Sequence, residues 1–235
     1  MIKLYSFQPI FVWESLLELG IWTSHFDLKK LILFQWGENE EQDELLDDMF
    51  YQAYLWLIKE MKSQKITNIS NSNNLIWAWY HWNNNKQKKP DKRFKSVKNF
   101  CGSEEFVMLE LEIEDDTRVS LHGYDAWHCV LNNFLLEINE EKGEEIEKHI
   151  KKQKKEFMLL NGVDKTYDFS LIEEREILSK SWRQIFNINN QHEYLECEKL
   201  DYSIQATIFE IFYTDVVKVH FFNSERKEKI LKIKR

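Results

Sequence analysis

The order of apolar and polar residues predicts a chain that mixes strands and helices. Three short apolar runs, at residues 2–8, 75–82 and 106–113, are typical of strands. Two more runs, at residues 202–213 and 216–222, indicate a C-terminal hairpin. The C-terminal residues that follow are basic and are expected to form a helix or a frayed tail.

Helical spacing is clearest over residues 41–64, where apolar side chains recur at three- and four-residue steps. A shorter helix is expected between Pro9 and Gly20, because proline suits a first helical turn and glycine a helix end. Thr23 or Ser24 is expected to begin a second short helix that ends at Leu28.

Further helices are expected in the second half of the chain. Asp125 is expected to cap a helix that continues to Glu137 and buries Trp127. Short helices are also expected to begin at Ser170 or Ser181.

These elements lack the regular strand–helix–strand repeat of a parallel sheet, so the predicted class is α+β. We expect one domain over residues 1–235, with a small, mostly antiparallel sheet and packed helices. The long helix is expected to cover the sheet. A heavily charged helical segment around residues 138–160 is expected to lie at the periphery.

Composition excludes several classes of protein. The 235 residues include 16 Phe, 9 Trp and 9 Tyr, which argues against general disorder. A net charge of −8 gives no overall attraction to nucleic acid. Three separated cysteines and widely spaced histidines predict neither disulfides nor a metal site. No signal peptide or membrane span is recognised, so we expect a cytoplasmic protein, and the Lys-, Asn- and Ile-rich composition fits a bacterial source.

Candidate chemistry comes from polar residues inside apolar runs, since an unpartnered buried polar group costs about 1–3 kcal/mol. A regular strand would place Glu210 on one face with Ile204, Ala206 and Ile208. Glu210 then either faces solvent in an ion pair or lies in a partly apolar cleft that tunes it for chemistry.

Similar alternatives hold for the other candidates. Trp79, Tyr80 and His81 either belong to the core or form a slot for a flat ring. The amide of Gln8 either bridges backbone groups or donates to a ligand. The basic loop at residues 86–98, which contains Arg93, is either a solvated surface or a contact for phosphates.

Five motifs resemble an uncharacterised bacterial family known only as a domain of unknown function. They are QPxxVW, WAWY, PDxR, DAWHxVLNN and IQATxxE, which begin at Gln8, Trp77, Pro90, Asp125 and Ile204. The resemblance extends over nearly the whole chain but implies no activity.

A second resemblance is to the ADP-ribosyltransferase superfamily. It rests on a first strand of the form Leu-Tyr-x-x-Gln, a helix that ends in glycine, an aromatic second strand and a late strand with Glu. The chain departs from that superfamily in lacking an Arg or His on the first strand and a Ser-Thr-Ser on the second. The resemblance implies that Glu210, Tyr80 and Gln8 are catalytic. It also implies that NAD, as cofactor, contacts a second set, namely Tyr5, Trp79, His81, Arg93 and Gln205.

Two functions therefore compete. The first is an NAD-dependent ADP-ribosyltransferase-like enzyme, a toxin or defence effector that modifies nucleic acid or protein. The second is a non-catalytic module that binds nucleic acid or protein through the aromatic strand and the basic loop. The enzyme requires Glu210, Tyr80 and Gln8 to converge, whereas the module requires exposed tryptophans along a basic groove. The sequence makes no prediction of oligomeric state.

Overall fold

The computed structural model describes residues 1–24, 43–82, 89–90, 105–136, 140–161, 172–189, 203–222 and 228–233. Its centre is a seven-stranded sheet in the order β5-β6-β3-β1-β4-β8-β9, and each neighbouring pair is antiparallel. A second, two-stranded sheet pairs β2 with β7. The strands are β1 (Ile2–Pro9), β2 (Ile21–Thr23), β3 (Ile76–His81), β4 (Phe106–Ile113), β5 (Ser120–Gly123), β6 (Ile204–Ile208), β7 (Glu210–Phe212), β8 (Val216–Phe222) and β9 (Glu228–Lys232). These sheets with packed helices confirm the predicted α+β class.

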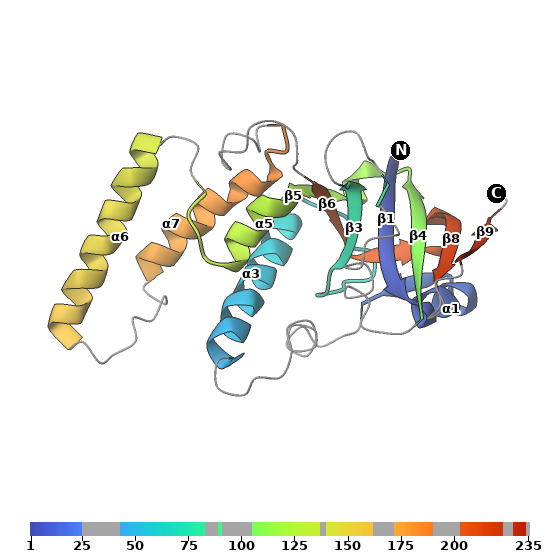
Figure 1. The fold of residues 1–235 in the computed structure, drawn as a ribbon, viewed down its shortest axis with the longest axis horizontal. Coiled ribbons are helices and arrows are strands. Elements are labelled where there is room, and N and C mark those ends of the chain that lie inside the picture. Colours follow the sequence, from blue (N-terminus) through green and yellow to red (C-terminus); the bar gives the residue numbers. More distant parts are fainter. Residues whose placement is uncertain are drawn as a thin grey trace.

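The helices gather mainly beside the β5 end of the large sheet, as Figure 1 shows. There α3 and α5 lie next to the strands, α7 lies beyond them, and α6 is outermost. A separate helix, α1, follows β1 at the other end of the molecule. The helices are α1 (Ile10–Leu19), α3 (Asp43–Ser63), α5 (Tyr124–Leu131), α6 (Glu140–Asn161) and α7 (Ile172–Trp182).

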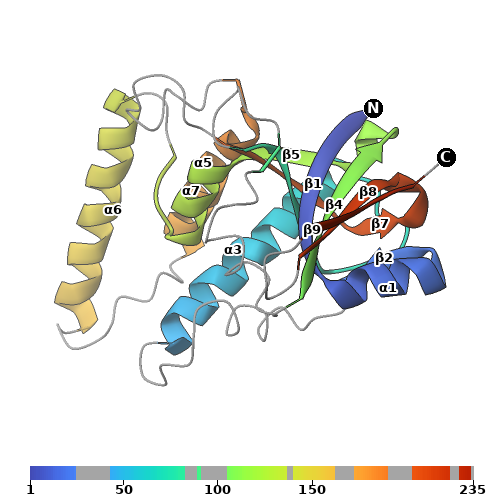
Figure 2. The ribbon, with the colours of Figure 1, turned by 45° about the vertical axis from the view of Figure 1, so that its right-hand side comes forward.

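The two faces of the large sheet have different cores. On one face, Val12, Trp13 and Leu16 of α1 belong to a cluster with Leu4 and Leu109 of the strands. On the other face, α3, α5 and α7 contribute Leu57, Trp127 and Trp182 to a second cluster. Figure 2 shows α1 below the sheet while α3 and α5 approach it from the side of β5. The second face is therefore covered by described helices mainly at its β5–β6–β3 end.

Alternation along β1 explains how one strand serves both faces. Leu4 belongs to the cluster under α1, whereas Tyr5 and Phe7 belong to an aromatic cluster on the opposite face. The first helix ends as predicted, because Gly20 adopts a left-handed conformation with φ 74° that a side chain would strain.

The C-terminal part differs from its prediction. Residues 202–213 do not form one strand, since the strand is interrupted at Phe209, between β6 and β7. No hairpin joins these strands to β8: β6 lies between β5 and β3, β7 pairs with β2, and β8 pairs with β4 and β9. Within the basic C-terminal segment, Glu228–Lys232 form strand β9 rather than a helix or a tail. Local pattern identified the apolar runs but not their distant partners.

Two helix predictions also need correction. Helix α5 begins at Tyr124 with Gly123 as its N-cap and no side-chain cap, so Asp125 lies in the first turn instead of capping it. The helix ends at Leu131, six residues before the expected Glu137. The short helix expected from Thr23 or Ser24 lies largely outside the described residues, although Thr23 itself ends strand β2.

Candidate functional site

On the face opposite α1, a row of side chains crosses the sheet, with one residue from each strand paired in register with the next. Paired residues of neighbouring strands point to the same face, so the row can be followed from strand to strand. From β5 to β8 it contains His122, Gln205, Trp79, Tyr5, Glu110 and Lys218. Tyr5, Trp79 and Gln205 are three of the residues for which the sequence predicts cofactor contact. The sheet therefore aligns them, and it adds a carboxylate that the sequence prediction did not include.

Glu110 is the centre of a charged cluster in this row. Its Oε1 accepts a hydrogen bond from Lys89 and lies 2.5 Å from Nε2 of His220 and 3.8 Å from Nζ of Lys218. The same ring nitrogen of His220 is 3.2 Å from Lys89 Nζ. Glu110 and His220 are buried, whereas the two lysine side chains are partly exposed. The cluster thus reaches from the interior of the sheet to solvent.

The surroundings keep Glu110 ionised. Burial alone would raise its pKa, but the hydrogen bonds from His220 and Lys89 and the charges of both lysines more than offset burial. The resulting pKa is about 2. A base with so low a pKa takes up protons poorly at neutral pH, so Glu110 is suited to act as a fixed negative charge.

Two oxygens at the cluster have no hydrogen-bond partner among the described residues. The three contacts of Glu110 all end on Oε1, and Oε2 has no partner among the described residues. The hydroxyl of neighbouring Tyr5 likewise makes no hydrogen bond with the described chain. Burial raises the pKa of Tyr5, and the charge of Glu110 raises it further, so the phenol stays protonated and can donate.

Aromatic rings continue the row towards α5. Lys89 Nζ lies 5.7 Å above the Tyr5 ring, a distance suited to a cation–π contact. The Trp79 ring has the rings of Trp82 and Tyr124 at 4.6 and 5.1 Å. The described part of the site therefore consists of a charged centre beside a cluster of packed aromatic side chains.

The β5 end of the row is buried and uncharged. His122 lies under the helices, with its ring 5.3 Å from that of Trp77. Burial lowers the pKa of His122 to about 3, so it is neutral at physiological pH. Oε1 of Gln205 and Nε1 of Trp77 are buried without a hydrogen-bond partner in the described chain. Polar groups therefore extend along the row beyond the charged cluster.

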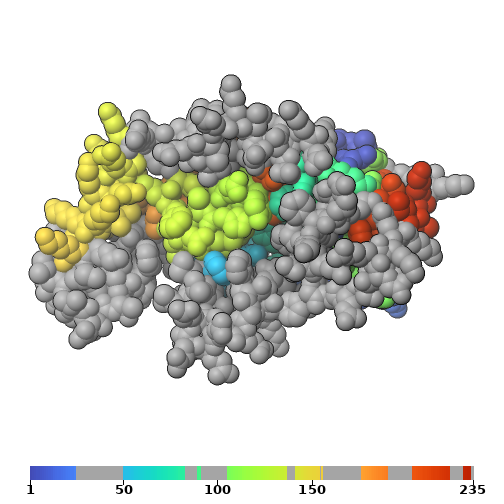
Figure 3. All heavy atoms as spheres, in the orientation of Figure 1, coloured from blue at the N-terminus to red at the C-terminus, as the bar shows by residue number. Residues whose placement is uncertain are grey.

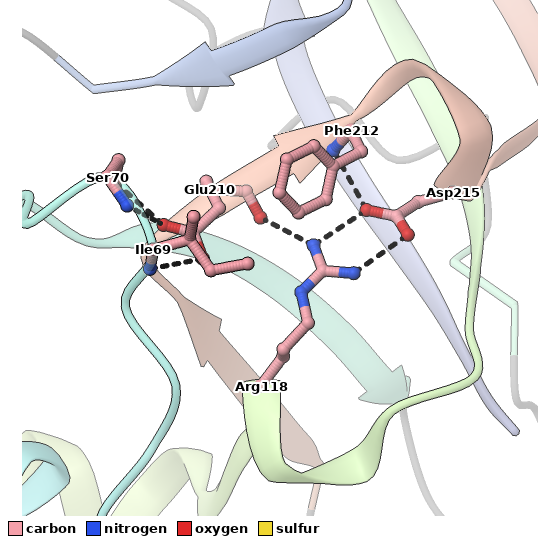
Figure 4. A network of polar contacts seen from close by, with 6 residues as sticks. All are labelled: Ile69, Ser70, Arg118, Glu210, Phe212 and Asp215. Atoms are coloured by element: carbon pink, nitrogen blue, oxygen red, sulfur yellow. Dashed lines mark hydrogen bonds and ion pairs between the residues drawn. The ribbon is translucent and has the colours of Figure 1, made fainter.

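Glu210 lies elsewhere, at the start of β7 (Figure 4). Its side chain is buried and accepts hydrogen bonds from the backbone amides of Ile69 and Ser70, at 3.2 and 3.3 Å. The hydroxyl of Ser70 donates a third at 2.7 Å. These contacts attach the polar loop before β3 to the small sheet. The geometry at Glu210 is that of a satisfied structural carboxylate.

A buried ion pair lies beside Glu210, as Figure 4 also shows. Arg118, in a 3-10 turn (Asp116–Arg118), donates to both oxygens of Asp215 at 2.9 and 2.8 Å. It also donates to the backbone carbonyl of Glu210 at 3.3 Å and lies 4.5 Å from the Phe212 ring. Asp215 in turn accepts from the backbone amide of Phe212. This network joins the small sheet to the end of β4.

The three residues predicted to be catalytic share no hydrogen bond with one another. Gln8 donates to Ser6 Oγ at 2.8 Å, and Ser6 donates to the carbonyl of Trp77. Tyr80 packs against the apolar cluster under α1 and stacks on His81, with ring centroids 4.4 Å apart. Gln8 and Tyr80 thus lie on the α1 face of the large sheet, whereas Tyr5 and Trp79 lie on the opposite face.

The aromatic strand is less regular than expected. Regular alternation would put Trp82 on the same face as Tyr80. A register shift between Trp79 and His81 interrupts the pairing of β3 with β6, and Trp82 clusters with Trp79 instead. Trp79 and Trp82 are both buried, which leaves their rings little surface for stacking with nucleic-acid bases. Arg93 and most of the basic loop lie outside the described residues.

The sequence prediction missed Glu110, His220 and Lys89. A signal for the first two was present: Glu110 interrupts the apolar run of β4, and His220 interrupts that of β8. Both are polar residues inside apolar runs, as Glu210 is. Lys89 had no such signal, because it is one of several lysines in the basic loop.

The described residues contain no cluster of metal-ligating side chains and no helix that could cross a lipid bilayer. The comparisons add little about activity. No curated protein and no solved structure matches the chain. One family model, a domain of unknown function called DUF3841, matches residues 3–217, and the chain therefore belongs to that family.

Proposed function

We propose that the protein is an NAD-dependent enzyme of the ADP-ribosyltransferase type, with Glu110 as its key carboxylate. The observation that carries this proposal is the environment of Glu110. It is ionised, it is held by His220 and Lys89, and it lies in one row with Tyr5 and Trp79. The last two are residues for which the superfamily resemblance implies contact with NAD.

The proposed chemistry needs a fixed negative charge. The bond between ribose C1′ and the nicotinamide nitrogen breaks, and nicotinamide leaves with the bonding electron pair. The positive charge that develops on the ribose is stabilised by a preorganised carboxylate. Oε2 of Glu110 has no partner in the described part of the chain and is the oxygen assigned to this role. The acceptor atom then bonds to C1′ and releases its proton to water.

The lysines support the choice of an anionic ligand. Lys89 and Lys218 both approach Glu110, so the cluster has more positive than negative charge even when His220 is neutral. The pyrophosphate of NAD would balance this excess. The hydroxyl of Tyr5, which makes no hydrogen bond with the described residues, would donate to a ribose or phosphate oxygen.

The test compares three glutamine variants in calorimetric titration with NAD and in nicotinamide release. We expect Glu110→Gln to lower nicotinamide release by about 100-fold or more, because it removes the charge and little volume. Glu112→Gln is the matched control: Glu112 is two residues away on the same face of β4 and pairs with Lys3 at 3.1 Å. This variant should release nicotinamide like the wild type.

Glu210→Gln separates the two carboxylates. We expect this variant to lower the unfolding midpoint but to keep the activity of the folded fraction. The reason is that both oxygens of Glu210 already accept hydrogen bonds from Ile69 and Ser70. A loss of activity in Glu210→Gln alone would return the catalytic role to Glu210. Absence of NAD binding at millimolar concentration would contradict the enzyme proposal altogether.

A further inference from the structure

Helix α6 has an uneven charge distribution along its length. Residues 140–147 contain five acids and one base, whereas residues 148–155 contain five bases and no acid. Each half is about 12 Å long at the α-helical rise. The helix lies at the outer end of the molecule, far from β8, and Figure 3 shows its surface (yellow) at that end. A segregated charge pattern is thus presented at the periphery of the described chain.

The contact between α6 and α7 is incomplete. A groove of about 410 Å³ separates parts of the two helices, and Ile146 and Ile177 are among its lining residues. Both isoleucines are half-buried. Glu145 and His149 of α6 also line it. The groove is therefore lined by apolar and charged side chains of both helices, since Lys180 of α7 lines it too.

Charges within α6 are only partly paired inside the chain. Lys148 contacts Glu144 at 2.9 Å and Lys151 contacts Glu147 at 3.1 Å, but these pairs are exposed and contribute little. Glu145 and Lys155 make no ion pair with the described residues. Glu145 in the acidic half and Lys155 in the basic half are therefore available to a partner.

We propose that α6 pairs in an antiparallel way with α6 of a second copy of this chain, forming a two-fold symmetric dimer. A two-fold axis near residue 148 places each acidic half against a basic half, so that Glu141 faces Lys155 of the partner subunit. A parallel pair would instead place like charges together. An isologous interface needs such a self-complementary surface, and the charge order of α6 provides one.

The test uses two charge-reversed proteins and light scattering during size-exclusion chromatography. Glu141→Lys/Glu145→Lys changes the net charge of α6 from 0 to +4, and Lys152→Glu/Lys155→Glu changes it from 0 to −4. We expect the wild type to be a dimer that weakens as salt rises, and each variant alone to lose the dimer peak. A one-to-one mixture of the two variants should form a heterodimer, because opposite charges then meet again.

The matched control is Glu14→Lys/Glu18→Lys, which changes the net charge equally on exposed residues of α1 and should stay dimeric. Circular dichroism checks that every variant keeps its helix content. A monomeric wild type would overturn the proposal. So would variants that remain dimers, or a mixture of helical variants that stays monomeric.

Discussion

At the scale of single residues, the four buried carboxylates of the described residues are stabilised in three different ways. Glu210 is held by backbone amides and a serine hydroxyl, Asp215 and Glu60 by the guanidinium groups of Arg118 and Arg183, and Glu110 by an imidazole and two lysines. Each arrangement compensates the loss of hydration that burial imposes on a charge. Among them, only Glu110 has an oxygen without a partner in the described part of the chain, and its lowered pKa keeps it ionised, so it is the candidate for function.

The lowered pKa of Glu110 predicts how stability depends on pH. The group titrates at 4.5 in its ordinary state and at about 2 in the folded protein. Its contribution to stability is therefore complete above pH 4.5 and is lost as pH falls through about 2. In urea denaturation, the difference in midpoint between wild type and Glu110→Gln should shrink over that interval. A difference that stays constant with pH would show that Glu110 gains nothing from its ionised partners.

At the scale of elements, α5 is held by one large aromatic anchor. Trp127 is buried, and its ring centroid lies 5.3 Å from that of Trp77 and 5.4 Å from that of Tyr54. It thereby joins α5 to both β3 and α3. The beginning of α5, in contrast, has no side-chain cap.

We predict that Trp127→Ala lowers the free energy of unfolding by about 3–5 kcal/mol, because it leaves a large cavity between three elements. Chemical denaturation followed by circular dichroism measures the change. Asp125→Ala is the control on the same turn and should change stability much less, since Asp125 makes no cap bond. A Trp127→Ala midpoint equal to that of the wild type would place the ring outside the core.

At the scale of the whole molecule, the small sheet depends on one buried ion pair. Arg118 follows β4, whereas Asp215 lies in the turn (Tyr213–Asp215) between β7 and β8. Their contact is bidentate and buried, and Arg118 also reaches the backbone of Glu210. The pair thus joins the β2–β7 sheet to the seven-stranded sheet.

A double-mutant cycle tests this connection. We expect Arg118→Met to lower the free energy of unfolding by about 3–5 kcal/mol, because Asp215 is left charged and buried without its partner. Adding Asp215→Asn should recover part of the loss, since the amide oxygen can still accept from Phe212. Losses that simply add in the double variant would mean that the two side chains are not coupled.

Prediction from sequence worked best where the pattern was local. The spans of β1, β3 and β4 lie within about two residues of those expected, and the long helix α3 overlaps its predicted range. Prediction failed where the sequence carries no local signal for the end of a strand. Phe209 continues the apolar run, yet β6 belongs to the large sheet and β7 to the small one. The interpretation of Glu210 assumed an unbroken strand, so it could not place this side chain at the start of β7 in the small sheet.

Period-two and period-3.6 patterns mark β1, β3 and β4 as strands and α3 as a helix, because these patterns are properties of neighbouring residues and need no knowledge of the fold. The same pattern marks Glu110 and Glu210 as charged residues inside apolar runs, but it leaves open what they contact. That Glu110 meets His220, 110 residues away, and that Lys89 joins them follows from the folded arrangement of the strands. Strand neighbours and register arise from long-range packing, since many pairings satisfy the same local pattern and only one of them buries both faces of the sheet together.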